Sequence, residues 1–115
     1  MKVIAASLDM MLASAEHLQQ VSRKDLRRGD RLLVFTRNSC YSLLLLEDGD
    51  FLVSGGWFDR HRRSPVKTTV AGCSWGGSVI KVDIVAACGL SLEFGNRLVT
   101  SAIQRIVIFK HGCSN

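Results

Sequence analysis

Proline and aromatic residues are scarce in this chain of 115 residues, which contains one proline, Pro65, and 7% Phe, Trp and Tyr. A single proline argues against a proline-rich linker or recognition segment. No window approaches the roughly 18 consecutive apolar residues of a membrane-spanning helix, and the densest apolar run is only Leu43–Leu46. We therefore expect one domain, residues 1–115, that makes no use of a membrane.

The four cysteines are too far apart in the sequence to form a C-x-x-C pair. This spacing argues against the common zinc and redox sites, and no three or four metal ligands show a recognisable pattern. We therefore expect no metal and no cofactor. Two disulfides would be possible in an oxidising compartment, but free and mostly buried thiols are the better interpretation without a convincing signal peptide. The expected location is cytoplasmic.

The N-terminal segment loosely imitates a short signal peptide, with Lys2 before an apolar stretch and small residues at 13–15. Asp9 interrupts that stretch, so we interpret the segment as folded structure. Ser7 can cap a helix, and apolar residues then recur at the i, i+3, i+4 and i+7 positions. This spacing predicts an α-helix over about residues 7–21. The residues of its apolar stripe are Leu8, Met11, Leu12, Ala15 and Leu18.

Residues 30–110 have the pattern of seven or eight short strands with glycine-rich turns about every ten residues. We expect an irregular loop at 54–65, a single strand over 78–87, and a turn at 100–104 before the last strand. Runs such as LLVF and LLLL are apolar on both faces. The predicted fold is therefore mainly β: a small closed or partly open antiparallel barrel, covered by the N-terminal helix or by a second copy.

Residues 72–76, Gly-Cys-Ser-Trp-Gly, match the G-x-S-x-G pattern of the nucleophile elbow in α/β-hydrolases. An elbow requires a helix after the serine, whereas two glycines and β-branched residues follow Ser74. Asp83 and His111 complete a triad only formally, because the chain is too short for a hydrolase sheet with its helices. We predict a turn between two strands and no catalytic residue.

Cys73 is a second nucleophile candidate, with His61 as its base. A catalytic thiol needs a lowered pKa, which the arginines around His61 would provide if that loop folded over Cys73. No local signature supports the pair, and a small cysteine in the core is the commoner situation. Enzymatic activity without a recognisable motif remains an open alternative.

The net charge of +5 arises from two short stretches. Arg23–Arg31 and Asp59–Lys67 each carry a net charge of +3, and arginine outnumbers lysine ten to five. Trp57 and Phe58 lie beside the second stretch, and aromatic rings among arginines are typical of surfaces that bind single-stranded nucleic acid. The predicted partner-binding residues are Trp57, Phe58, Arg60, Arg62, Arg63 and Lys67, together with Arg27, Arg28 and Trp75.

We expect a non-catalytic β-barrel binding module that associates with itself, with a dimer favoured, and presents the loop around Trp57 to a partner. The alternative is a binder of nucleic acid or another polyanion that uses the two basic stretches. A barrel that holds a small ligand in its mouth, and an enzyme without a recognisable motif, are further alternatives. The interpretation that requires no partner is that the charged residues form an exposed, solvated loop surface.

Overall fold

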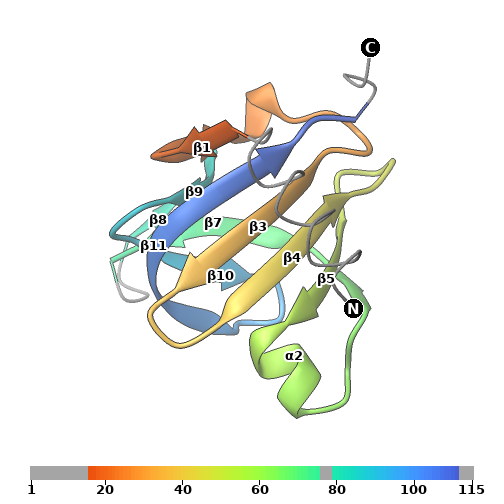
Figure 1. The fold of residues 1–115 in the computed structure, drawn as a ribbon, viewed down its shortest axis with the longest axis vertical. Helices are drawn as coiled ribbons and strands as arrows, with labels where there is room; N and C mark the ends of the chain where they lie inside the picture. Colours follow the sequence, from red (N-terminus) through yellow and green to blue (C-terminus); the bar gives the residue numbers. More distant parts are fainter. Residues whose placement is uncertain (1–15, 76–78, 112–115) are drawn as a thin grey trace, which may run out of the picture.

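The computed structural model describes residues 16–75 and 79–111, which form a mainly β structure with antiparallel sheets (Figure 1). The strands are β1 (Glu16–Leu18), β2 (Gln20–Ser22), β3 (Arg31–Thr36), β4 (Cys40–Leu45), β5 (Phe51–Gly55), β6 (Val66–Thr68), β7 (Val70–Ser74), β8 (Ile80–Lys81), β9 (Ile84–Ala87), β10 (Ser91–Phe94) and β11 (Val99–Phe109). The helical segments are the short 3-10 helix η1 (Arg23–Asp25) and the α-helix α2 (Gly56–Arg60).

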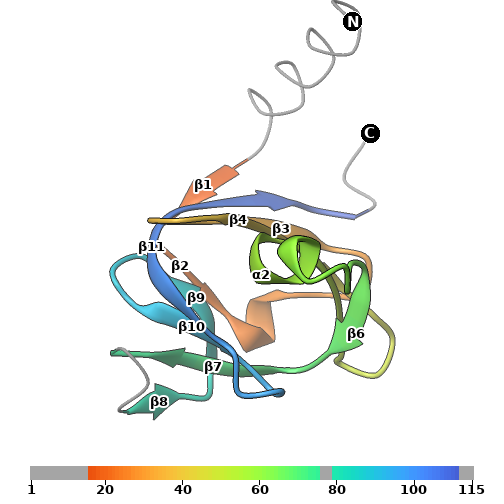
Figure 2. The ribbon, with the colours of Figure 1, turned by 90° about the horizontal axis from the view of Figure 1, so that it is seen from below.

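The strands form a nine-stranded sheet and a separate two-stranded sheet of β2 and β9. The order in the large sheet is β6-β5-β4-β3-β11-β10-β7-β8, with β1 also paired to β11. Figure 2 shows that this sheet curls, so that β3 and β4 lie on one side and β7 on the opposite side. Only Thr69 separates β6 from β7, so the chain itself turns the corner between two distant parts of the sheet. Among the described strands, hydrogen bonding does not close the predicted barrel into a ring.

The core lies inside the curl, and the strand pattern explains which side chains reach it. Successive side chains of a strand point to opposite faces. Leu32 and Val34 of β3 are accordingly buried. Leu33 and Phe35, which alternate with them, are half-buried on the outside. On that outer face, the guanidinium of Arg105 lies over the Phe35 ring, 4.5 Å from its centroid. The apolar second face of β3 is thus partly covered by an arginine.

The predicted N-terminal helix is wrong for its C-terminal part, because residues 16–18 and 20–22 are β1 and β2. The apolar spacing in this segment is compatible with a helix and with a strand. The segment forms strands because β1 pairs with β11 and β2 pairs with β9. The rest of the prediction, residues 7–15, lies outside the described residues.

Three other expectations for the elements need correction. The segment at 54–65 includes the helix α2, and the expected strand at 78–87 is interrupted after Lys81, which gives β8 and β9. The turn at 100–104 is absent: β11 runs without a break from Val99 to Phe109. Its register against β3 shifts between Ile103 and Arg105, which is a β-bulge rather than a turn.

Asp30 is the most buried charged side chain described, and it joins the start of β3 to the end of β11. Its carboxylate accepts hydrogen bonds from the backbone N–H groups of Arg27 and His111, each at 2.9 Å, and from Lys110 Nζ at 3.0 Å. Burial alone would raise the pKa of Asp30, but the bonds from His111, Arg27 and Lys110 outweigh it and lower the pKa below 3.8. Three donors from two chain segments therefore converge on one buried anion.

Replacing Asp30 with Asn should reduce the free energy of unfolding by about 2–4 kcal/mol, because Lys110 loses its ion pair and a backbone donor faces an amide NH2. The native contribution is complete above the ordinary pKa of 3.8 and is lost as the pH falls through the lower folded-state pKa. Urea unfolding as a function of pH should show a steeper loss on acidification in the native chain than in Asp30→Asn.

The control is Arg28→Ala, which breaks the Arg28–Glu47 pair whose side chains are 68% and 78% exposed. This change should cost no more than about 0.5 kcal/mol. Identical acid profiles for the native chain and Asp30→Asn would contradict the role of the buried carboxylate.

Candidate functional site

The helix α2 follows β5 through two glycines with positive φ, Gly55 at 97° and Gly56 at 46°. A Cβ atom at Gly55 would overlap the carbonyl oxygen of Cys40, and one at Gly56 would overlap the ring of Tyr41. Both positions therefore need glycine for conformation and for space. They bring the start of α2 directly against β4.

Phe58 anchors α2 to the core and is completely buried. Its ring packs edge-on against Phe94, with centroids 5.2 Å apart, and against Tyr41 at 6.2 Å. The Tyr41 hydroxyl also accepts a hydrogen bond from the backbone N–H of Trp57 at 3.3 Å. Phe58 is therefore not a partner-binding residue as predicted; it fixes the helix that carries its neighbours.

Trp57 is half-buried and stacks on His61, with ring centroids 4.1 Å apart and an angle of 22° between the rings. His61 Nδ1 donates to the Trp57 carbonyl at 2.8 Å, which fixes the imidazole over the indole. The guanidinium of Arg63 lies 5.8 Å from the Trp57 ring centroid, within the range of a cation–π contact. An aromatic pair with an arginine beside it thus forms the outer surface of this helix.

A shallow pocket of about 160 Å³ lies between α2, the β3–β4 turn and the start of β11. Trp57 and Arg60 line it on the side of α2, and Ser39 and Ser101 line it on the other sides. Arg60 Nη1 donates to Ser39 Oγ at 3.1 Å, so this arginine is held at the rim. The pocket therefore combines a ring face, a guanidinium and hydroxyl groups.

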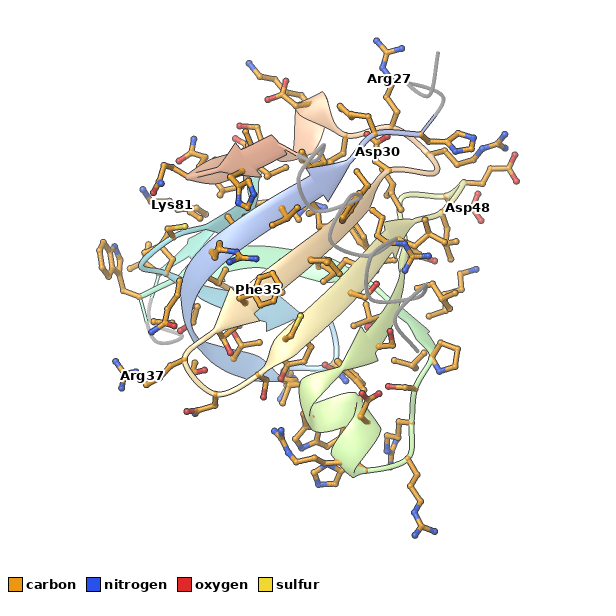
Figure 3. All side chains as sticks on the ribbon, in the orientation of Figure 1. Arg27, Asp30, Phe35, Arg37, Asp48 and Lys81 are labelled. Atoms are coloured by element: carbon orange, nitrogen blue, oxygen red, sulfur yellow. The ribbon has the colours of Figure 1, made fainter. Side chains whose placement is uncertain are left out.

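Five exposed arginines surround this end of the molecule. Arg60, Arg62 and Arg63 come from α2 and the turn after it, and two more come from the turns beside the pocket: Arg37 before Asn38 and Arg97 before Leu98. Figure 3 shows Arg37 projecting outward from the β3–β4 turn. None of the three ion pairs among the described residues involves these arginines.

The acidic residue of α2, Asp59, is held by its own loop. Hydrogen bonds from the Ser64 side chain and from the Gly55 N–H, the latter at 3.0 Å, lower the pKa of Asp59. These bonds hold the carboxylate within its own loop.

The surface formed by Trp57, His61 and the five arginines is called the α2 surface below.

The remaining predicted site residues do not join the α2 surface. Arg27 lies at the end of the molecule opposite to Arg37 (Figure 3), and Arg28 next to it pairs with Glu47 at 2.9 Å. Lys67 on β6 pairs with Asp50 at 3.6 Å. The two basic stretches therefore occupy different ends and do not form one surface.

Trp75 is also separate from Trp57. It directly follows β7 and is 64% exposed, and β8 lies apart from α2 in both views (Figures 1 and 2). Val79 and Val82 near it are 63% and 61% exposed. The two tryptophan-bearing segments thus mark two surfaces, one basic and one apolar.

The two nucleophile candidates have surroundings unsuited to catalysis. Ser74 is buried at the end of β7, its hydroxyl donates to Glu93 Oε2 at 3.1 Å, and the next described element is the strand β8 rather than a helix. Cys73 is buried, its thiol donates to the Val85 carbonyl at 3.3 Å, and burial raises its pKa to about 11. The predicted turn at residues 72–76 needs correction: residues 72–74 belong to β7, which pairs antiparallel with β8, and residue 76 lies outside the described residues.

Sequence reasoning missed the parts of the site that come from other turns. Arg37 and Ser39 belong to the turn between β3 and β4, and Arg97 and Ser101 flank the start of β11. Nothing in the linear sequence places these turns beside residues 57–63. Pairing of β3 with both β4 and β11 brings them there.

No protein-family model, no curated protein and no solved structure matches this chain. Among the described residues, no helix has the length and apolar character needed to cross a membrane. The same part of the chain holds no group of three or more His, Cys, Asp or Glu side chains placed to bind a metal ion.

Replacing Gly55 with Ala should displace α2 and destabilise the fold by about 3 kcal/mol, because backbone strain adds to the overlap with Cys40. The matched control is Gly49→Ala: Gly49 also has a positive φ, 84°, but a Cβ there meets nothing within 4 Å. This control should cost only about 1 kcal/mol. Thermal unfolding with tryptophan fluorescence measures both, and equal losses would contradict the close approach at Gly55.

Proposed function

We propose that this protein is a non-catalytic small β-barrel module that binds single-stranded nucleic acid through the α2 surface. The observation that carries the proposal is the Trp57–His61 stack surrounded by five exposed arginines that form no ion pair within the described residues. Arginines supply contacts to phosphates, and exposed rings supply faces on which bases stack. Both kinds of group lie here on one end of the molecule.

The shallow pocket adds to this chemistry. It is open, about 160 Å³ in volume, and combines the Trp57 ring with the Arg60 guanidinium and the Ser39 hydroxyl. A base that is stacked on an aromatic ring leaves its phosphate close enough for arginine contacts. A duplex offers no free base face, so the arrangement favours single strands.

The rigid support of α2 favours binding without a large rearrangement. Phe58 is locked in the aromatic core, and Gly55 and Gly56 leave no room between α2 and β4. Side chains on a fixed helix lose less entropy on binding than side chains on a loose loop. The free thiols of Cys40, Cys73 and Cys88 accord with a cytoplasmic setting, which is part of the proposal.

Replacing Arg60, Arg62 and Arg63 with Ala should weaken binding of a labelled oligothymidylate of about 12 nucleotides at least tenfold at low salt, because the phosphates lose their cationic partners. The slope of log K against log salt should become shallower by about 2, since each lost phosphate contact contributes about 0.7 for a single strand. Fluorescence anisotropy over a salt series measures both quantities.

The control replaces Arg27 and Arg28 with Ala at the opposite end, which removes two positive charges rather than three and should change affinity less than about threefold. Trp57→Ala should also weaken binding, by roughly 1–3 kcal/mol, through loss of stacking. Absence of binding by the native chain at low salt would overturn the proposal, as would an equal effect of the two charge variants. Binding of an acidic peptide instead would indicate a protein partner.

A second candidate role, self-association, is favoured by the apolar surface at the β7–β8 hairpin. Trp75, Val79, Ile80 and Val82 are exposed there, and β8 is an end of the hydrogen-bonded strand path. Exposed apolar side chains at the edge of a sheet favour pairing with another chain. We therefore propose that two copies associate through this hairpin, with a dimer as the expected assembly.

Replacing Val82 with Lys should shift the protein towards monomer, because the new charge would be desolvated in the contact. Light scattering after size-exclusion chromatography at micromolar concentrations should give a dimer for the native chain and a smaller species for Val82→Lys. Lys24→Ala, an exposed change on η1, serves as the control. A native chain that is monomeric throughout this range would refute the dimer.

A further inference from the structure

Arg23 lies away from the α2 surface and is held in a fixed orientation by backbone carbonyl groups. Its Nη2 donates to the carbonyl oxygens of Val70 and Val82, both at 2.9 Å, and its Nε donates to Val82 at 3.1 Å. Within the described part of the chain, Nη1 has no hydrogen-bond partner. The Arg23 guanidinium is therefore held through Nε and Nη2, and the N–H groups of Nη1 can donate to a further acceptor.

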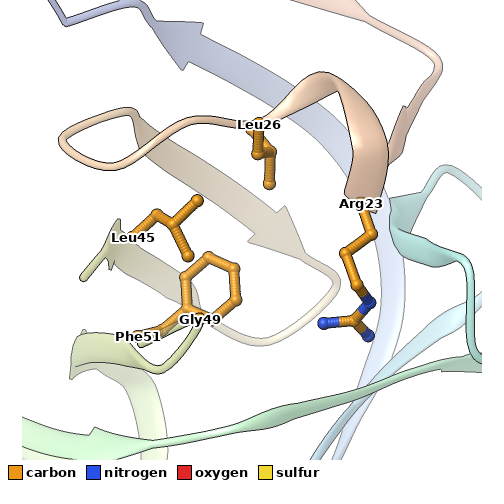
Figure 4. Close-up of a pocket in the computed structure, with 5 residues that line it drawn as sticks. All are labelled: Arg23, Leu26, Leu45, Gly49 and Phe51. Atoms are coloured by element: carbon orange, nitrogen blue, oxygen red, sulfur yellow. The ribbon is translucent and has the colours of Figure 1, made fainter. Parts of the chain in front are cut away.

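This guanidinium borders a pocket of about 240 Å³, the Arg23 pocket, whose other lining is apolar. Leu26, Leu45 and Phe51 line it with Gly49, and Figure 4 shows Arg23 at one side of the pocket with Phe51 and Leu45 at the other. Phe51 is almost fully buried, so its ring belongs to the core, whereas the two leucines are half-buried. None of these four residues carries a negative charge.

We propose that the Arg23 pocket binds an apolar carboxylate, with the carboxylate on the Arg23 guanidinium and the apolar group against Leu26, Leu45 and Phe51. A guanidinium pairs with a carboxylate through two parallel N–H···O bonds or through a single one when fewer donors are free. Here Nη1 is the group available for it. The site is independent of the proposed nucleic-acid binding, because it shares no residue with the α2 surface.

The volume indicates the size of the apolar group. A dry cavity of about 150 Å³ accommodates a benzene ring, so 240 Å³ accommodates a phenyl ring with a short acid arm. A phosphate ester or a nucleotide would require more polar groups than the lining offers, since Arg23 is the one polar side chain among these five. The charge and the lining together select a monoanion with a hydrocarbon body.

Two sources can supply this chemistry: a free small acid and the C-terminal carboxylate of a peptide with an apolar last residue. The test therefore uses 3-phenylpropanoate as the small acid and a pentapeptide that ends in Phe as the peptide. The uncharged comparisons are 3-phenylpropanamide and the same peptide with an amidated C-terminus. Isothermal titration calorimetry gives affinities, and amide chemical shifts in ¹⁵N-labelled protein locate the site.

The native chain should bind at least one of the two carboxylates ten times more tightly than its amide, with shift changes centred on Arg23, Leu26 and Gly49. Binding of 3-phenylpropanoate alone assigns a small-molecule ligand, and binding of the peptide acid assigns a peptide C-terminus. Equal affinities for acid and amide would overturn the proposal, because the guanidinium would then contribute nothing. Lack of binding by both acids at millimolar concentration would overturn it as well.

Three variants test the residues. Arg23→Met should abolish the preference for the acid over the amide, and Leu26→Trp should weaken both by at least tenfold by filling the pocket while Arg23 stays in place. Arg28→Met, in the same basic stretch but paired with Glu47, should leave both affinities unchanged. If Arg23→Met fails to fold, the acid–amide comparison on the native chain and Leu26→Trp still decide. Unchanged binding by Leu26→Trp would place the ligand elsewhere.

Discussion

The arrangement of this protein depends on one strand, β11, which pairs with three others. Along its eleven residues it is hydrogen-bonded to β10 near its start, to β3 through its middle and end, and to β1 on the other side. The side chains of Ile103, Ile106 and Ile108 are buried from the same strand. Their burial adds to the apolar area removed from water, which is the main favourable contribution to folding. Because β11 pairs with both β10 and β3, it also determines where the two halves of the curled sheet meet.

The two ends of the molecule differ in what they offer to a ligand. At one end, α2 and the turns before β4 and β11 carry five arginines around an aromatic stack. At the other, Lys110 is paired with Asp30 and Arg28 with Glu47, and the Arg23 guanidinium donates to backbone carbonyl groups. Two sequence stretches of equal net charge thus lie in different surroundings, one at an aromatic stack and the other beside an apolar pocket.

Local sequence patterns predicted most of the strands but not their assembly. The hairpin of β3 and β4 and the strand β5 after the Asp48–Asp50 turn follow from alternation and turn residues, and β10 follows from its alternating apolar residues. The short helix α2 was missed because its five residues are too few for helical periodicity to show. The burial of Phe58 was missed for another reason: Trp57 and Phe58 are equivalent in the sequence, and only packing against Tyr41 and Phe94 distinguishes them.

The bulge in β11 has a consequence for the length of the chain. Strict alternation from Ile103 would direct residues 105 and 107 inward, yet Ile106 and Ile108 join the core and Arg105 lies outside over Phe35. The extra residue at 104 therefore exchanges the inner and outer faces halfway along the strand. The number of residues between Ile103 and Ile106 is fixed by this parity, so the segment tolerates changes of residue type at position 104 far better than an insertion or deletion of one residue.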